Sequence, residues 1–269
     1  MSIDNFNWWH QIQGFSEELD THKVPEEDGS DYKINSYSYR CHEFTTNHKG
    51  KHVLFSGCSN TYGVGLKKEE VWAYKVYNKI NEVEGSSGYF NIALSGNSIV
   101  SSILNIFKYC KKFGNPNVIF INLPSQDRFF NFDEKEKEYR IVENSVLSKT
   151  HYIEKLTFYN YYLMLEQYCS SNNIKLFSFT WDNYDQHFLN KNINKTYESV
   201  NVVFKNYNFK TFYYINEKEM LNDLFLLKQK DNNKFFDIAR DNMHRGTGAH
   251  TYWSNFIYNK YLEKLKNNE

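Results

Sequence analysis

Proline and glycine, the residues that interrupt chains and loosen them, are scarce: 3 Pro and 12 Gly in 269 residues. Long flexible linkers between domains are therefore not expected, and the chain is long enough to bury one substantial core. An excess of either charge is also missing, because Lys and Arg together number 32 and Asp and Glu together number 32. This balance argues against a nucleic-acid-binding protein that relies on overall positive charge.

Long apolar runs and cysteine clusters are absent as well. No stretch approaches eighteen apolar residues, so no membrane span is predicted, and the first nine residues lack the basic start and apolar core of a secretory signal. The four cysteines lie far apart, without a pair or a Cys/His cluster at zinc spacing: Cys41, Cys58, Cys110 and Cys169. These absences predict a cytoplasmic protein with reduced thiols, no metal and no membrane partner.

What the chain does contain, from residue 53 onward, is an alternation of short apolar runs and stretches with helical periodicity. The predicted strands are 53–56, 90–94, 118–123 and 174–180. The predicted helices are about 68–80, 98–113, 148–171 and 250–266. Strand–helix units of this size predict an α/β fold, a three-layer α/β/α sandwich around a mostly parallel sheet.

The remaining segments define the expected domain organisation. Residues 1–50 contain too few apolar residues for a core of their own, so we expect an N-terminal arm packed on a single domain of residues 51–269. Within the arm, residues 37–44 alternate enough to suit an edge strand or an extended segment. Residues 181–235 are expected to form an insertion with short helices, one of them near 217–227.

Two stretches could carry chemistry together. The first predicted strand breaks at residue 57 into a turn rich in glycine and small polar residues, which presents Ser59 at the carboxyl end of the sheet. Near the other end of the chain, Asp241 precedes His244 by three residues. Such an Asp can accept the imidazole N–H, which leaves the other ring nitrogen to take the serine proton. The alternatives are a plain turn serine and a structural histidine at the start of the last helix.

These blocks resemble those of the SGNH (GDSL-type) hydrolases. Gly57-Cys58-Ser59 is similar to the family's Gly-Asp-Ser nucleophile block, with Cys58 in place of Asp, and Asp241-x-x-His244 is similar to its C-terminal block. The resemblance covers roughly residues 53–262 and implies a flavodoxin-like fold. By strand alternation, the Cys58 side chain is expected to point away from Ser59, which disfavours a thiol enzyme.

The resemblance also implies an oxyanion hole. Gly96, in a stretch similar to the second block, would give a backbone N–H beside that of Ser59. The third block, normally Gly-x-Asn-Asp, is Pro-Ser-Gln-Asp here, so Gln126 falls at the position of the asparagine donor. Asn97 could supply a donor instead. Arg128, just past the third strand, could hold a substrate carboxylate or phosphate, although a solvated arginine is the simpler interpretation.

The function implied by the resemblance is serine ester hydrolysis through an acyl-enzyme. Ser59 would attack, His244 would act as base and then acid, and Asp241 would orient His244. No cofactor is required, and the expected substrate is a small-molecule or carbohydrate ester, with acetyl groups on carbohydrate as the family-level expectation. Two alternatives stay open: an O-acyltransferase that uses the same triad, and a non-catalytic binding or structural module that retains the fold.

Overall fold

The structure, a computed structural model, describes residues 35–37, 39–124, 128–133, 138–143, 151–180, 211–215, 239 and 244–267. Its strands are β1 (Val53–Ser56), β2 (Phe90–Asn91), β3 (Val118–Asn122), β4 (Arg128–Asp133), β5 (Glu138–Glu143), β6 (Lys175–Thr180) and β7 (Phe212–Tyr214). Its helices are α2 (Ser59–Tyr62), the 3-10 turn η3 (Lys68–Glu70), α3 (Trp72–Glu84), α4 (Ile99–Phe113), α5 (His151–Ser171) and α9 (Thr247–Lys266).

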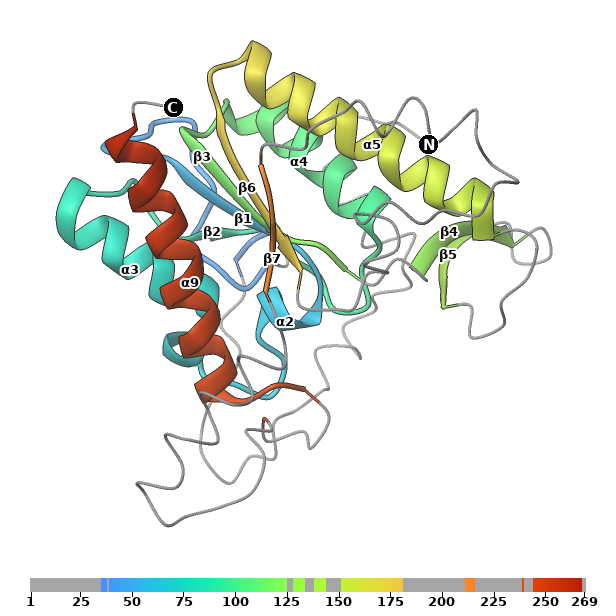
Figure 1. The fold of residues 1–269 in the computed structure, drawn as a ribbon, viewed down its shortest axis with the longest axis horizontal. Coiled ribbons are helices and arrows are strands. Elements are labelled where there is room, and N and C mark those ends of the chain that lie inside the picture. Colours follow the sequence, from blue (N-terminus) through green and yellow to red (C-terminus); the bar gives the residue numbers. More distant parts are fainter. Residues whose placement is uncertain are drawn as a thin grey trace.

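Five parallel strands form the main sheet in the order β2-β1-β3-β6-β7. Counted in chain order within this sheet, the order is 2-1-3-4-5, which is the flavodoxin-like arrangement. Helices α4 and α5 cover one face, and α3 and α9 cover the other (Figure 1). The predicted three-layer α/β/α fold is therefore confirmed.

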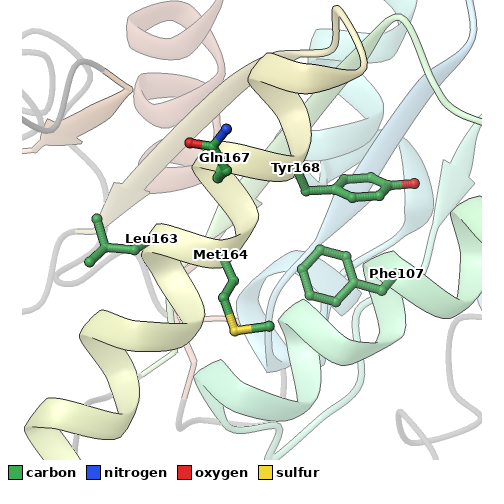
Figure 2. Close-up of a pocket in the computed structure, with 5 residues that line it drawn as sticks. All are labelled: Phe107, Leu163, Met164, Gln167 and Tyr168. Atoms are coloured by element: carbon green, nitrogen blue, oxygen red, sulfur yellow. The ribbon is translucent and has the colours of Figure 1, made fainter.

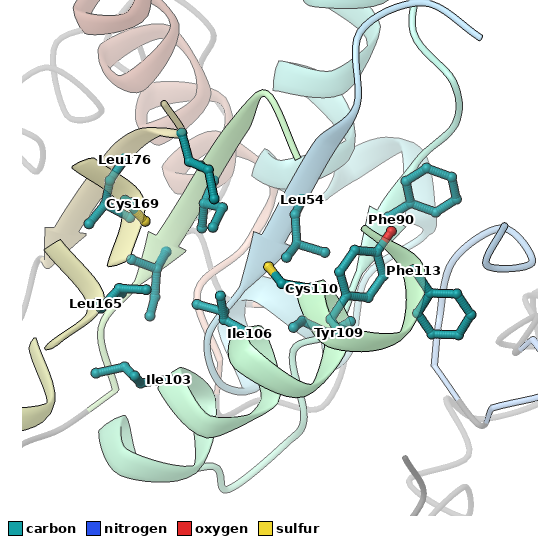
Figure 3. Packing of buried hydrophobic residues seen from close by; sticks show 14 of the residues in the cluster. Leu54, Phe90, Ile103, Ile106, Tyr109, Cys110, Phe113, Leu165, Cys169 and Leu176 are labelled. Carbon is teal, nitrogen blue, oxygen red and sulfur yellow. The ribbon is translucent and has the colours of Figure 1, made fainter. Parts of the chain in front are cut away.

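The two faces of the sheet carry separate apolar cores because side chains alternate along each strand. Leu54 and Ile119 belong to the core under α4 and α5 (Figure 3), whereas Phe55 and Phe120 belong to the core under α3 and α9. All residues of β1 and β3 are buried, as expected for strands covered on both faces.

Several elements depart from the sequence-based expectations. The helix predicted from residue 68 is the 3-10 turn η3 followed by α3, and the run predicted at 90–94 forms only the two-residue strand β2. Two elements were not predicted: the antiparallel β4–β5 hairpin and β7, which adds a parallel strand beside β6. Residues 181–210 and 216–235, including the helix expected near 217–227, lie outside the described residues, as do residues 1–34.

Residues 39–50 form bends and irregular extended segments that pack on the sheet and on α4. Tyr39 and Phe44 are buried in the core under α4, and the ring of Tyr37 meets that of Phe113 edge-on with centroids 5.3 Å apart. Of the described helices, none combines the length and apolar character needed to cross a bilayer.

Candidate active site

The turn after β1, residues 57–66, is here named the Ser59 turn. Gly57 has a φ of +148°, and a Cβ there would lie 2.6 Å from the carbonyl oxygen of Asn122 and closer still to Thr61 Oγ1. Only glycine fits this close approach, which lets the chain turn sharply from β1 into α2. Ser59 is the first residue of α2 and is 5% exposed. It therefore follows the first strand where β1 neighbours both β2 and β3, the position at which flavodoxin-like sheets bind their ligands.

The Gly57 carbonyl anchors the beginning of the Ser59 turn to the segment after β2. It accepts hydrogen bonds from Leu94 N at 3.4 Å, Asn97 Nδ2 at 3.3 Å and Ser102 Oγ at 3.5 Å. Asn97 is fully buried, and its Nδ2 also donates to Ser102 Oγ at 2.9 Å. Both protons of this amide are used within the protein, so Asn97 acts here as a support of the turn.

The end of the Ser59 turn is held by side chains from two other segments. Arg40 is buried; its Nη1 donates to the carbonyl oxygens of Tyr62 and Gly63 at 3.1 and 2.6 Å, and its Nη2 to that of Leu66 at 2.6 Å. Asn91 Nδ2 donates to the carbonyl oxygen of Thr61 at 2.8 Å. A four-residue helix leaves its last carbonyls without intrahelical donors, and the side chains of Arg40 and Asn91 supply these donors.

Gly96, whose backbone N–H is the expected second donor of the oxyanion hole, lies in a tight turn between β2 and α4. The N–H of Asn97 donates to the carbonyl of Leu94 at 3.3 Å, and Gly96, with a φ of +70°, is the third residue of this turn. A positive φ at that position favours glycine. Gly96 is exposed, and its turn leads into α4, whose N-cap Ser98 accepts a hydrogen bond from Ser101 N.

His244 lies just before α9, and its backbone carbonyl accepts the N–H of Ala239 at 2.8 Å. Because α9 runs back across the sheet, its beginning lies at the same edge as α2 (Figure 1). His244 is half-buried. Ser59 and Gly96 follow β1 and β2 at the carboxyl edge of the sheet, and His244 lies three residues before the first residue of α9, whereas Asp241 and Gln126 lie outside the described residues.

The second histidine of this region, His250, has a structural role. It is buried in the first turns of α9, and its Nδ1 accepts the N–H of Trp72 at 3.0 Å, which joins α9 to the start of α3. Burial lowers the pKa of His250 to about 3. Three nearby basic side chains act in the same direction: Lys75, His244 and Arg40. His250 is therefore neutral at physiological pH.

The end of β3 holds a polar residue that the sequence analysis passed over. Asn122 is fully buried, and neither atom of its amide has a hydrogen-bond partner among the described residues. Its signal in the sequence is a lone polar residue within an otherwise apolar strand. Arg128, predicted as a substrate-binding residue, begins β4 and is half-buried.

The described residues offer no metal site, since no group of three or more His, Cys, Asp or Glu side chains converges within the described ranges. A pocket of about 680 Å³ lies elsewhere, between α4 and α5, and Figure 2 shows its lining side chains. It is lined by Phe107, Leu163, Met164, Gln167 and Tyr168. None of the predicted site residues contributes to it.

Comparison with known proteins finds similarity among solved structures alone. No protein-family model matches the sequence, and no curated protein is significantly similar to it. Among solved structures, the chain is similar to an acetyl xylan esterase (Est2A) from the rumen bacterium Butyrivibrio proteoclasticus, with 11% identity and a TM-score of 0.48. The match covers 80% of this chain and 64% of the esterase, so the chain spans less than two thirds of that protein's length.

Proposed function

We propose that this protein is a serine esterase of the SGNH type. The observation that carries the proposal is the position of Ser59, which begins a helix directly after the first strand of a flavodoxin-order sheet. Ligands of such sheets bind at this point, so a bound ester would meet the serine hydroxyl there. His244, three residues before α9, is the proposed base from the other end of the chain, and α9 begins at this edge of the sheet (Figure 1). Support for the turn from three separate segments suits a residue that must be held in one geometry.

In the proposed reaction, Ser59 Oγ bonds to the carbonyl carbon of the ester while His244 removes the hydroxyl proton. The tetrahedral intermediate collapses as His244 gives that proton to the departing alcohol oxygen, which leaves an acyl group on Ser59. Water then attacks the acyl-enzyme with His244 again as base, which releases the carboxylic acid and restores the serine. Asp241 accepts the second imidazole N–H and so fixes the orientation of His244.

The negative oxygen of each intermediate needs hydrogen-bond donors beside Ser59. The backbone N–H of Ser59 suits this role, because the first N–H groups of a helix have no intrahelical acceptor. The Gly96 N–H is the second proposed donor and the Gln126 side-chain amide the third. A single donor of this kind typically contributes about a hundred- to a thousandfold to the rate. Asn97, whose amide protons are engaged by Gly57 and Ser102, contributes instead by holding the turn.

For the substrate, we propose a small acyl ester, with an acetyl group on a carbohydrate as the first candidate. Transfer of the acyl group to a sugar hydroxyl would use the same residues and differ only in what resolves the acyl-enzyme. Product analysis with and without a sugar acceptor separates the two reactions, because a transferase forms an acylated sugar where a hydrolase forms free acid.

The test of the serine is covalent labelling with a fluorophosphonate probe, followed by peptide mapping. We expect one labelled site, Ser59, together with turnover of p-nitrophenyl acetate. The Ser59→Ala variant should lose both, and His244→Ala should lower kcat by about a thousandfold or more, as triad deletions do.

The neighbouring thiol supplies the matched control. Cys58→Ala leaves the hydroxyl in place, so it should keep both labelling and turnover. Wild-type protein that is folded but neither labelled nor active would show that the chain is a binding or structural module and overturn the proposal. Labelling that disappears in Cys58→Ala and persists in Ser59→Ala would identify a thiol enzyme.

A further inference from the structure

Arg40 lies outside every block that resembles a hydrolase motif, yet its side chain donates hydrogen bonds to three backbone carbonyls of the Ser59 turn. It comes from the arm before β1 and is 5% exposed. Its guanidinium reaches the carbonyl oxygens of Tyr62, Gly63 and Leu66 at 2.6–3.1 Å. Hydrogen bonds from a charged donor are about twice as strong as neutral ones, and the fixed fork of arginine suits several acceptors at once.

The helix that carries Ser59 depends on outside support. A single turn of helix is unstable alone, because nucleation fixes three residues for one hydrogen bond. Within α2, the Ser59 carbonyl accepts the N–H groups of Gly63 and Val64, at 2.8 and 3.1 Å. The carbonyls of Tyr62 and Gly63 accept hydrogen bonds from Arg40, whose positive charge also lies at the negative end of the short helix.

The position of Arg40 is itself fixed by the arm. Asn35 Oδ1 accepts the N–H of Tyr39 at 3.0 Å, and Asn35 Nδ2 donates to the carbonyl of His42 at 3.0 Å, so the bend around Arg40 is closed by one side chain. The N–H of His42 donates to the carbonyl of Tyr89 at 3.0 Å, and the Tyr89 N–H returns to His42 Nδ1 at 3.1 Å. This reciprocal pair attaches the bend to the segment leading into β2.

Room for the guanidinium is provided by Gly63. This residue has a φ of +85°, and a Cβ there would lie 3.0 Å from Arg40 Nη1 and closer to Val71 Cγ2. A side chain at residue 63 would therefore press on both the arginine and the residue that precedes α3. The turn and the arginine fit each other as a pair.

We propose that Arg40 is a positioning residue for the candidate active site: it holds the end of the Ser59 turn so that the serine keeps one orientation at its beginning. This inference rests on the proposed serine chemistry for its kinetic consequence. Its structural part, that Arg40 fixes residues 57–66, is independent of any reaction. Arg40 acts through the backbone of the turn and does not touch the substrate.

Two variants separate geometry from charge. Arg40→Lys keeps the charge but loses the fork that reaches three carbonyls, and Arg40→Met removes both. Ile80→Ala is the matched control for lost stability, because Ile80 is fully buried in α3 and lies about 12 Å further along that helix than Trp72. Comparisons are made at a temperature at which all four proteins remain folded by circular dichroism.

The first measurement is hydrogen–deuterium exchange of the peptide covering residues 57–66, without substrate. Both Arg40 variants should exchange at least tenfold faster there than wild type, whereas Ile80→Ala should leave this peptide unchanged. Exchange in Arg40→Lys and Arg40→Met within twofold of wild type would overturn the proposal. This result stands whether or not the protein is an esterase.

The second measurement is kinetic. Arg40→Lys should label with fluorophosphonate and turn over p-nitrophenyl acetate about ten- to a hundredfold more slowly, through kcat, with KM changed less than threefold. Ile80→Ala should stay within twofold. A folded Arg40→Lys protein with faster exchange but unchanged kcat and labelling would refute the positioning role. Wild-type protein without labelling at Ser59 would instead refute the esterase proposal. The exchange measurement alone would then decide whether Arg40 fixes residues 57–66.

Discussion

Replacement of Gly57 by alanine tests the close packing beneath the Ser59 turn. The new Cβ would lie 2.6 Å from the carbonyl oxygen of Asn122, which belongs to the central strand β3, and closer still to the buried Thr61 Oγ1. A backbone atom in a paired central strand cannot move away cheaply. Overpacking of this kind typically costs about 1–3 kcal/mol. The φ of +148° adds strain of about 1–3 kcal/mol for a residue with a side chain.

Gly114→Ala is the matched control, because Gly114 also has a positive φ, +91°, but nothing within 4 Å of the position a Cβ would take. Both variants share the backbone strain and the reduced entropy of the unfolded chain, so their difference isolates the overlap. We expect Gly57→Ala to be less stable than Gly114→Ala by about 1–3 kcal/mol. At about 2–4 °C per kcal/mol, the thermal midpoints should differ by roughly 2–12 °C.

The assay is thermal and urea unfolding of both variants followed by circular dichroism at pH 7.5. Labelling of Ser59 should also slow in Gly57→Ala, because any shift that relieves the overlap moves the start of the turn. Equal unfolding midpoints for the two variants would show that β3 and Thr61 can shift to accommodate the new Cβ at little cost. That result would refute the argument that this turn is tightly packed.

Two further predictions concern buried polar groups. Burial lowers the pKa of both His52 and His250 to about 3. As the pH drops below about 6.5, these two histidines therefore become protonated in the unfolded chain but stay neutral in the folded chain. Stability should therefore fall as the pH drops from about 6.5 toward 3, by up to about 1.4 kcal/mol per pH unit for each histidine. Below about pH 5.5, urea titrations should show that the free energy of unfolding of His250→Gln depends on pH with a slope smaller by about one proton, and an unchanged slope would contradict this. Asn97→Ala removes a buried amide that holds Gly57 and should lower the free energy of unfolding by about 1–3 kcal/mol and slow Ser59 labelling. Ser98→Ala removes the cap of α4 and a hydrogen bond to Ser101 Oγ, but no hydrogen bond to Gly57. It should cost about 1 kcal/mol in the same urea assay without slowing labelling, and slower labelling would mean that the stability of α4, and not the turn, sets the labelling rate.

The sequence predicted those elements whose pattern is local. The predicted bounds of the strand 53–56 and of the helix 98–113 agree with β1 and α4 to within one residue. The signals for both are local, namely a short apolar run for the strand and an N-cap serine followed by helical periodicity for the helix. The β4–β5 hairpin was not predicted because its segment is charged as well as aromatic and shows no clear alternation of apolar and polar residues. The pairing of its side chains becomes visible only in the cross-strand register, where Arg128 is opposite Glu143. Strand β7, three residues long, is set by pairing with β6 and carries too little pattern to recognise.

The same distinction applies to the candidate site. Ser59 and His244 were predicted because short motifs mark them, and the structure has Ser59 at the start of α2 and His244 three residues before α9. Their partnership remains a prediction, as do the roles of Asp241 and Gln126. Arg40 and Asn91 had no signal, since a lone arginine in an arm and an asparagine in a strand are ordinary in sequence. Their role appears only when the fold brings them to the carbonyls of the Ser59 turn.

The way in which the Ser59 turn is held has a consequence for how substitutions should act. Its beginning is fixed by Asn97, from the segment before α4, and its end by Asn91 of β2 and Arg40 of the arm. Each of these side chains donates to a backbone carbonyl of the turn and not to a turn side chain. Loss of any one leaves the other two, and the serine should lose orientation before the domain loses its fold. Substitutions in three distant segments should therefore converge on slower Ser59 labelling, and combined substitutions should be non-additive because they act on one element.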